Sequence, residues 1–147
     1  MNKVFFDLEW NTGFLDGNSF DEIIEIGAVK TDEEYRQIDG FRRLIRPVIY
    51  RKMNPYIQKI LAITMKDLQG EEPLAAVAKV FFDWCGDCDT LIAWSGNDFG
   101  VLEKNLAHIG MKIPEQLVRY DVQMAYAYRT ENSIRNYALK TAVEAME

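Results

Sequence analysis

Cysteine is scarce in this 147-residue sequence, which contains only Cys85 and Cys88. Two cysteines do not make a disulfide framework, so we expect a chain that functions in the cytoplasm. Long hydrophobic runs are also absent, and the apolar run at the N-terminus is interrupted by Asp7 and Glu9. We therefore expect no transmembrane span, no signal peptide and no membrane partner.

Linkers and repeats are absent as well. The four prolines are scattered, and no segment is rich in glycine or serine. Hydrophobic residues make up 48% of the sequence and charged residues 27%, as in ordinary globular proteins. We predict a single domain over residues 1–147.

The net charge of −6 disfavours bulk attraction to nucleic acid, but the charge is unevenly distributed. Residues 40–66 contain no acidic residue and seven basic ones, namely Arg42, Arg43, Arg46, Arg51, Lys52, Lys59 and Lys66. Such a segment is more often a solvated surface than a binding site, so it is only a first indication of an anionic partner.

Hydrophobic periodicity predicts the order βββ-α-β-α-β-α. The predicted strands are residues 3–9, 22–30, 38–45, 90–94 and 118–122, and residues 10–20 have turn composition. Predicted helical segments begin at Asn54-Pro55, at Thr64 and at Pro73, and two more cover 98–109 and 133–146. Three strands joined by short connections, then βα units, predict an α/β fold with a mixed five-stranded sheet flanked by helices.

Two acidic residues at the predicted end of the first strand are candidates for chemistry. Asp7 and Glu9 are two residues apart, so their side chains project from the same face. Adjacent carboxylates at the edge of a core repel each other and lose hydration, and a divalent cation between them removes both costs. Oxygen donors favour Mg²⁺ or Mn²⁺.

By themselves these acids also fit a strand end that faces water. A third acid, Asp98, favours the metal site over that alternative, because it follows the predicted strand at 90–94 and opens the next helix. An aspartate there also fits simple stabilisation of a helix N-terminus. If the three carboxylates converge, however, a metal site explains them better than three independent surface acids.

The sequence resembles the DEDD superfamily of 3′–5′ exonucleases, which has the ribonuclease H-like fold. FDLEW matches the first motif of that superfamily, and AWSGNDFGVLEKNL matches the second at Asp98. DEIIEIGAVK and FRRLIRP match its second and third strands, and NPYIQKILAITMKDL, RYDVQMAYAY and YALKTAVEAME match later segments. The resemblance covers almost the whole chain and favours the subgroup with a histidine base.

The third motif of the superfamily, a histidine or tyrosine base and a fourth aspartate, has no counterpart here. His108 ends the helix that begins at Asp98, and Tyr137 has Thr141 rather than an acid four residues later. Asp121 lies in the fifth predicted strand, where we assign it a structural role. We therefore expect a C-terminally incomplete domain that is weakly active or inactive by itself.

The resemblance implies an enzyme that releases nucleoside 5′-monophosphates from single-stranded RNA or DNA 3′ ends with two Mg²⁺ or Mn²⁺ ions. Asp7, Glu9 and Asp98 would be the catalytic metal ligands. Trp10 and Asn11 follow the acidic pair and are candidates for stacking on and hydrogen bonding to the terminal base, although simple packing explains Trp10 equally well.

Two other functions remain open. The same fold can serve as a catalytically dead module that binds nucleic acid or protein. The sequence Cys85-Gly-Asp-Cys88 has the spacing of a redox or half-zinc motif, but no second pair completes it. A shortened chain would also expose an apolar face through which copies associate, so the oligomeric state is open.

Overall fold

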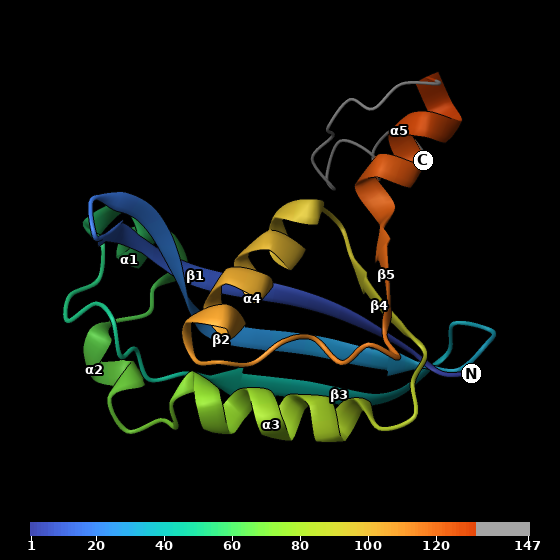
Figure 1. Ribbon diagram of the computed structural model, residues 1–147, viewed down its shortest axis with the longest axis horizontal. Coiled ribbons are helices and arrows are strands. Elements are labelled where there is room, and N and C mark those ends of the chain that lie inside the picture. The colour runs from blue at the N-terminus through green and yellow to red at the C-terminus, as the bar shows by residue number, and fades with distance from the viewer. Residues whose placement is uncertain (132–147) are drawn as a thin grey trace.

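The computed structural model describes residues 1–131 and contains a five-stranded sheet with the order β3-β2-β1-β4-β5 (Figure 1). Strands β1 (Lys3–Leu15), β2 (Asn18–Thr31) and β3 (Gln37–Leu44) are antiparallel neighbours. Strands β4 (Thr90–Ala93) and β5 (Val118–Asp121) run parallel to β1. The predicted meander followed by βα units is thus confirmed, and the predicted helix at 133–146 lies outside the described residues.

One face of the sheet carries the main hydrophobic core. Val4, Phe6 and Leu8 alternate along β1 with residues that are less buried, and they pack with residues of α3 (Leu74–Cys85) and α4 (Gly96–His108). Phe81 of α3 is completely buried. A side chain of that size contributes about 1.5–3 kcal/mol by leaving water. This packing fixes the beginning of α4 beside the sheet.

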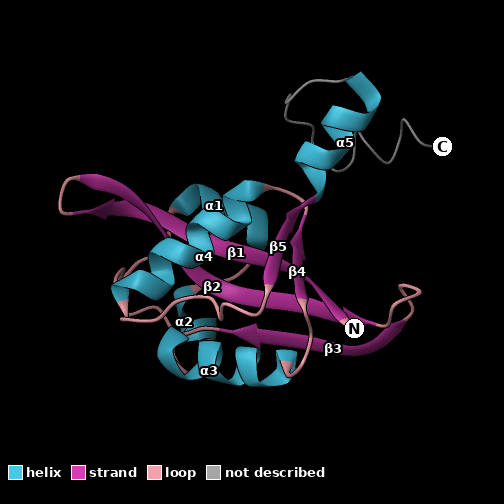
Figure 2. Cartoon of the chain, turned by 45° about the vertical axis from the view of Figure 1, so that its right-hand side comes forward, coloured by secondary structure: helices cyan, strands magenta, loops and turns pink. Residues whose placement is uncertain are grey.

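The predicted turn over residues 10–20 is wrong, because β1 and β2 continue through most of it as one long hairpin (Figure 2). Only Asp16 and Gly17 form the turn, with φ angles of 51° and 81°, and Leu15 pairs with Asn18. Asp-Gly adopts two successive positive φ angles at low cost, so a two-residue turn is sufficient. The polar residues around it lie on strands that are only partly buried, where polarity does not break a strand.

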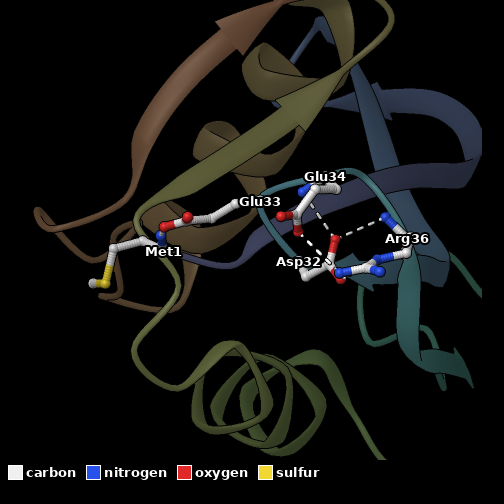
Figure 3. Close-up of polar contacts among 5 residues, drawn as sticks. All are labelled: Met1, Asp32, Glu33, Glu34 and Arg36. Atoms are coloured by element: carbon white, nitrogen blue, oxygen red, sulfur yellow. Dashed lines mark hydrogen bonds and ion pairs between the residues drawn. The ribbon is translucent and has the colours of Figure 1, made fainter.

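The connection between β2 and β3 is held by a local network around Asp32 (Figure 3). The Asp32 carboxylate accepts hydrogen bonds from the backbone amides of Glu34 and Arg36, both at 2.9 Å, and from the Arg36 side chain at 2.8 Å. The N-terminal amine of Met1 forms an ion pair with Glu33 in the same turn. These contacts are exposed, and they stabilise the connection at the end of β2 that lies away from the Asp16-Gly17 turn.

The remaining helices begin largely where their capping residues predict. Helix α1 (Pro55–Leu61) is capped by Asn54, and α2 (Met65–Leu68) has a capping box between Thr64 and Asp67. Helix α5 (Val122–Glu131), which the sequence analysis did not predict, follows β5 directly. None of the helices in the part of the chain that the structure describes is long and apolar enough to span a membrane.

Candidate active site

Asp7 and Glu9 lie within β1 rather than at its end. Asp7 is exposed and Glu9 is half-buried, and both alternate with the buried Leu8, as the sequence predicts. The pairing with β2 shifts register between Glu9 and Trp10, which marks a β-bulge. Glu9 pairs with Glu25 and Trp10 with Ile23, so the extra residue is Ile24 of β2 and the bulge bends β2. Asp7 and Glu9 keep the regular alternation of β1 around the buried Leu8. Both acidic side chains therefore project from the face of the strand opposite the main core.

Asp98 reaches this region from α4. Strand β4 pairs with β1 only from Lys3 to Phe5, and it ends at Ala93 while β1 continues. The beginning of α4 lies where β4 has ended, and the backbone groups of Leu8 and Ser95 lie close enough to the Asp98 carboxylate to lower its pKa. The Ser95 hydroxyl accepts a hydrogen bond from the Asn97 amide at 3.2 Å. Ser95 thus caps α4, and Asp98 lies in the first turn of that helix beside the open edge of β1.

A cleft of about 480 Å³ joins two of the predicted site residues. It is lined by Phe5, Phe6, Asp7, Ile92, Ala93, Trp94, Asp98 and Val122. Asp7 and Asp98 thus face the same open space, although they are 91 positions apart in the sequence. Glu9 does not line this cleft, but its charge acts on the same group of carboxylates, as its pKa shows.

The electrostatics of the cluster favour a positive charge among the three acids. Burial, then the neighbouring Asp7, raises the pKa of Asp98 from 3.8 to about 6. Burial also raises the pKa of Glu9, with further contributions from Asp7, Glu25 and Asp98. The Asp98 and Glu9 carboxylates are therefore costly to ionise beside the neighbouring acids. Protonation or a bound cation relieves this repulsion.

The donor set fits a hard divalent cation, because carboxylate oxygens are the ligands that Mg²⁺ and Mn²⁺ prefer. Two of these acids face one cleft, and the buried one is destabilised in its charged form. Within the described part of the chain, however, no group of three or more His, Cys, Asp or Glu side chains is close enough to hold a metal. Binding an ion would require the partly exposed Asp7 and Glu9 side chains to turn toward Asp98.

The two predicted substrate-binding residues differ in their placement. Trp10 is half-buried and packs against the main core. Asn11 is only 1% exposed, and its amide donates to the Lys52 carbonyl at 3.1 Å and accepts from the Asn54 amide at 2.8 Å. Both ends of the Asn11 amide thus have a partner within the protein, and a hydrogen bond from this side chain to a nucleotide stays a prediction.

Asn11 fixes part of the basic segment beside the acidic strand. Its two bonds hold residues 52–54 next to β1, two positions beyond Glu9. The preceding residues are fixed by Glu22, a buried carboxylate that accepts from the amides of Val48, Ile49 and Tyr50 at 2.8–2.9 Å. Sequence reasoning missed both anchors, because a buried Asn or Glu in a strand carries no local signal for its distant partners.

His108 and the cysteine pair lie outside the site. His108 is the last residue of α4, as predicted, and its ring lies 5.9 Å from that of Phe20. It lies ten positions after Asp98 in the helix, which is roughly 15 Å along the axis. Cys85 and Cys88 are buried free thiols, and burial raises the pKa of Cys85 to about 12. A protonated, buried thiol is a poor nucleophile and a poor metal ligand.

Comparisons with known proteins agree with this arrangement. Residues 4–146 match the sequence model of the exonuclease family RNase_T. The DNA polymerase III PolC-type of Clostridium perfringens (strain 13 / Type A) is 34% identical over 109 residues, which are 73% of this chain and 7% of that protein. The chain thus spans only a small part of the length of that relative.

Solved structures show the same fold at low sequence identity. The nuclease domain of 3′hExo, a DEDDh family member bound to rAMP, is 17% identical with a TM-score of 0.74, covering 90% of this chain and 71% of that one. E. coli Exonuclease I in complex with an oligonucleotide is 16% identical with a TM-score of 0.67, covering 93% and 32%. These likenesses confirm the mixed sheet with flanking helices that the sequence predicts. With the family match over nearly its full length, the chain belongs to the RNase_T exonuclease family, as an exonuclease domain of the DEDD type.

Proposed function

We propose that this domain is a metal-dependent 3′–5′ exonuclease that hydrolyses single-stranded RNA or DNA and releases nucleoside 5′-monophosphates. The observation that carries the proposal is the shared cleft of Asp7 and Asp98, with Glu9 coupled to both. Membership of the exonuclease family supports the reaction class, and the neighbours described as 3′-exonucleases support the proposed strand polarity. Whether the substrate is RNA or DNA depends on contacts to the 2′-hydroxyl.

Asp7, Glu9 and Asp98 would hold the Mg²⁺ or Mn²⁺ ions. When bound, such ions supply Lewis-acid chemistry, which lowers the pKa of an attacking water and stabilises the departing 3′ oxygen. The chain's own residues position the donors. The backbone groups of Leu8 and Ser95 favour the ionised Asp98 carboxylate, and the alternation of β1 around Leu8 places Asp7 and Glu9 on one face. Because the ions offset the carboxylate charge, an anionic strand can approach an acidic cleft.

The basic segment would contact the phosphate backbone of the strand. Helix α1 has no buried residue, and Lys52 and Lys59 are exposed beside or on it. Asn11 joins this segment to the strand that carries Asp7 and Glu9. Lysines at this place would add attraction that does not depend on base sequence.

We expect the 147-residue chain alone to turn over slowly. A general base must come within hydrogen-bonding reach of the attacking water. The only histidine of the sequence, His108, lies at the opposite end of α4 from Asp98. Catalysis would then depend on the carboxylates and the bound ions alone, without a histidine to accept the proton of the attacking water.

The decisive experiment measures cleavage of single strands labelled at the 5′ or the 3′ end, with Mg²⁺, with Mn²⁺ and with a chelator. We expect slow, chelator-sensitive loss of single nucleotides from the 3′ end, with 5′-monophosphates identified by chromatography. Asp7→Ala should lower the rate on the order of 100-fold, since it removes several kcal/mol of charge stabilisation. Asp83→Ala, which removes an exposed carboxylate from α3, is the matched control and should leave the rate unchanged.

Two outcomes would contradict the proposal. A rate that survives Asp7→Ala would place the chemistry elsewhere or in a contaminant. Binding of single strands without any cleavage under all metal conditions would favour the catalytically dead binding module instead.

A further inference from the structure

Strands β4 and β5 end side by side, and each leads directly toward a helix (Figure 1). Ala93 at the end of β4 pairs with Asp121 at the end of β5, and the Gln123 amide donates to the Trp94 carbonyl at 2.6 Å. Helix α4 begins at Gly96 and α5 at Val122. The amino ends of the two helices are therefore brought together at the edge of the cleft that contains Asp98.

The Asp121 carboxylate lies between these two helix ends. One oxygen, Oδ1, accepts a hydrogen bond from the Met124 amide at 3.0 Å, which is the N-capping bond of α5. The other, Oδ2, lies 3.0 Å from the position that a Cβ atom on Gly96 would take. A side chain at Gly96 would therefore press on the carboxylate, which would have to move by a few tenths of an ångström.

Gly96 is two residues before Asp98 in the first turn of α4, so contact with Asp121 acts on the segment that orients Asp98. The charge of Asp121 also reaches Asp98, since it contributes to raising the pKa of that residue. A negative group is favourable at the positive end of a helix, which stabilises the position of Asp121 against both α4 and α5.

We propose that Asp121 is a positioning residue of the carboxylate site: it braces the first turn of α4 against the end of β5 and thereby fixes Asp98 toward Leu8 and the cleft. This inference rests on the proposed function for its catalytic meaning, but the bracing itself is a property of the fold. Asp121 is outside the lining of the cleft, so it acts through Gly96 and Asp98 rather than on a substrate.

The test follows the Leu8 amide, because the Leu8 backbone lies close enough to the Asp98 carboxylate to lower its pKa, so its exchange reports the position of that carboxylate. Hydrogen exchange on the whole chain should show the Leu8 amide exchanging about fivefold faster in Asp121→Ala, the factor expected for losing one capping bond. Asp121→Asn keeps an oxygen acceptor for the Met124 amide and should restore most of the protection. Gly96→Ala, which displaces the carboxylate by a few tenths of an ångström, should give a smaller increase.

A control separates bracing from general loss of stability. Thr64→Ala removes the side-chain cap of α2, which packs in a separate cluster with Ile24 and Met53. We expect it to lower the unfolding midpoint about as much as Asp121→Ala while leaving the Leu8 amide protected. Equal Leu8 exchange in wild type and Asp121→Ala, or equal acceleration in Thr64→Ala, would overturn the inference.

Titration with Mn²⁺ alone, by calorimetry, connects the bracing to the site. We expect Asp121→Ala to weaken Mn²⁺ binding about fivefold, by the same loss of one capping bond. Thr64→Ala should bind as the wild type does. If the wild type binds no Mn²⁺, the proposed metal-dependent function fails, and the Leu8 exchange still decides whether Asp121 positions Asp98.

Discussion

At the residue scale, Asp98 combines two roles that compete energetically. It is the third residue of α4, where the positive end of the helix and the nearby backbone of Leu8 and Ser95 favour the ionised form. Its burial and the nearby Asp7 favour the neutral form more strongly, and the pKa is therefore raised to about 6. A residue that only capped a helix would not need to be buried beside another acid, and this conflict is typical of functional sites.

The raised pKa predicts how stability depends on pH. A carboxyl group whose pKa rises on folding contributes stability that is fully present below about pH 4 and is lost as the pH rises through about 6. Residue 98 cannot ionise in Asp98→Asn. The free energy of unfolding of this variant, relative to that of the wild type, should therefore rise by about 2–3 kcal/mol from pH 4 to pH 7. Urea denaturation at several pH values measures this difference in the free energy of unfolding.

The exposed Asp83→Asn is the control for removing one negative charge. If the difference between Asp98→Asn and wild type is the same at pH 4 and pH 7, the burial of Asp98 is not costly in solution. Adding Mn²⁺ at pH 7 should stabilise the wild type more than Asp98→Asn, since the ion relieves the same repulsion.

Trp10 is the second residue whose role can be separated by substitution. It packs partly against the core, and it follows Glu9 at the β-bulge. We expect Trp10→Ala to weaken binding of a single strand about tenfold, because stacking on one base contributes about 1–3 kcal/mol. Fluorescence anisotropy measures the binding, and thermal unfolding measures the accompanying loss of stability. A large fall in melting temperature with unchanged binding would assign Trp10 to packing alone.

At the scale of elements, the sequence predicts those parts of the fold whose signals are local. The apolar period of α3, the Asn54-Pro55 start of α1 and the capping box of α2 each lie within a few residues, and the structure confirms them. The sequence pattern did not predict the long hairpin of β1 and β2, because polar residues 10–20 have the composition of a turn. The strands there are stabilised by pairing along their whole length. Helix α4 begins at Gly96, two residues before the predicted start at Asp98, and Ser95 caps it by accepting from the Asn97 amide.

The loop after β3 depends on one buried carboxylate. Glu22 is 4% exposed and accepts three backbone hydrogen bonds from residues 48–50. Glu22→Gln places an amide group opposite amide donors, so we expect a loss of about 2 kcal/mol or more in the free energy of unfolding. Chemical denaturation checks this value. Glu115→Gln, which disrupts only an exposed pair with Lys112, should have little effect, and equal losses would refute the anchoring role.

At the scale of the whole molecule, the site depends on contacts that local sequence patterns do not contain. Asp7 and Glu9 are found by strand alternation, and Asp98 by its place after the fourth strand. Asp121 is different, since its effect on Asp98 requires the parallel pairing of β4 with β5 and the contact with Gly96. The anchors Asn11 and Glu22 likewise act on partners 26–43 positions away. Such residues can be assigned only when the topology is known.

The distribution of charge over the molecule leads to a last prediction. The chain carries a net charge of −6, yet the basic segment is held beside the acidic strand by Asn11. If Lys52 and Lys59 contact phosphates, replacing each with alanine should weaken binding to strands of different sequence by the same factor. Each change should also reduce the magnitude of the slope of log K against log salt by about 1 or slightly less.

Lys79→Ala, which removes an exposed charge on α3, is the matched control. Binding measured from low to moderate salt with Mg²⁺ present separates the two lysines from the control. An unchanged slope in Lys52→Ala and Lys59→Ala would mean that the strand follows another path across the molecule, and that the net charge is overcome at the carboxylates alone.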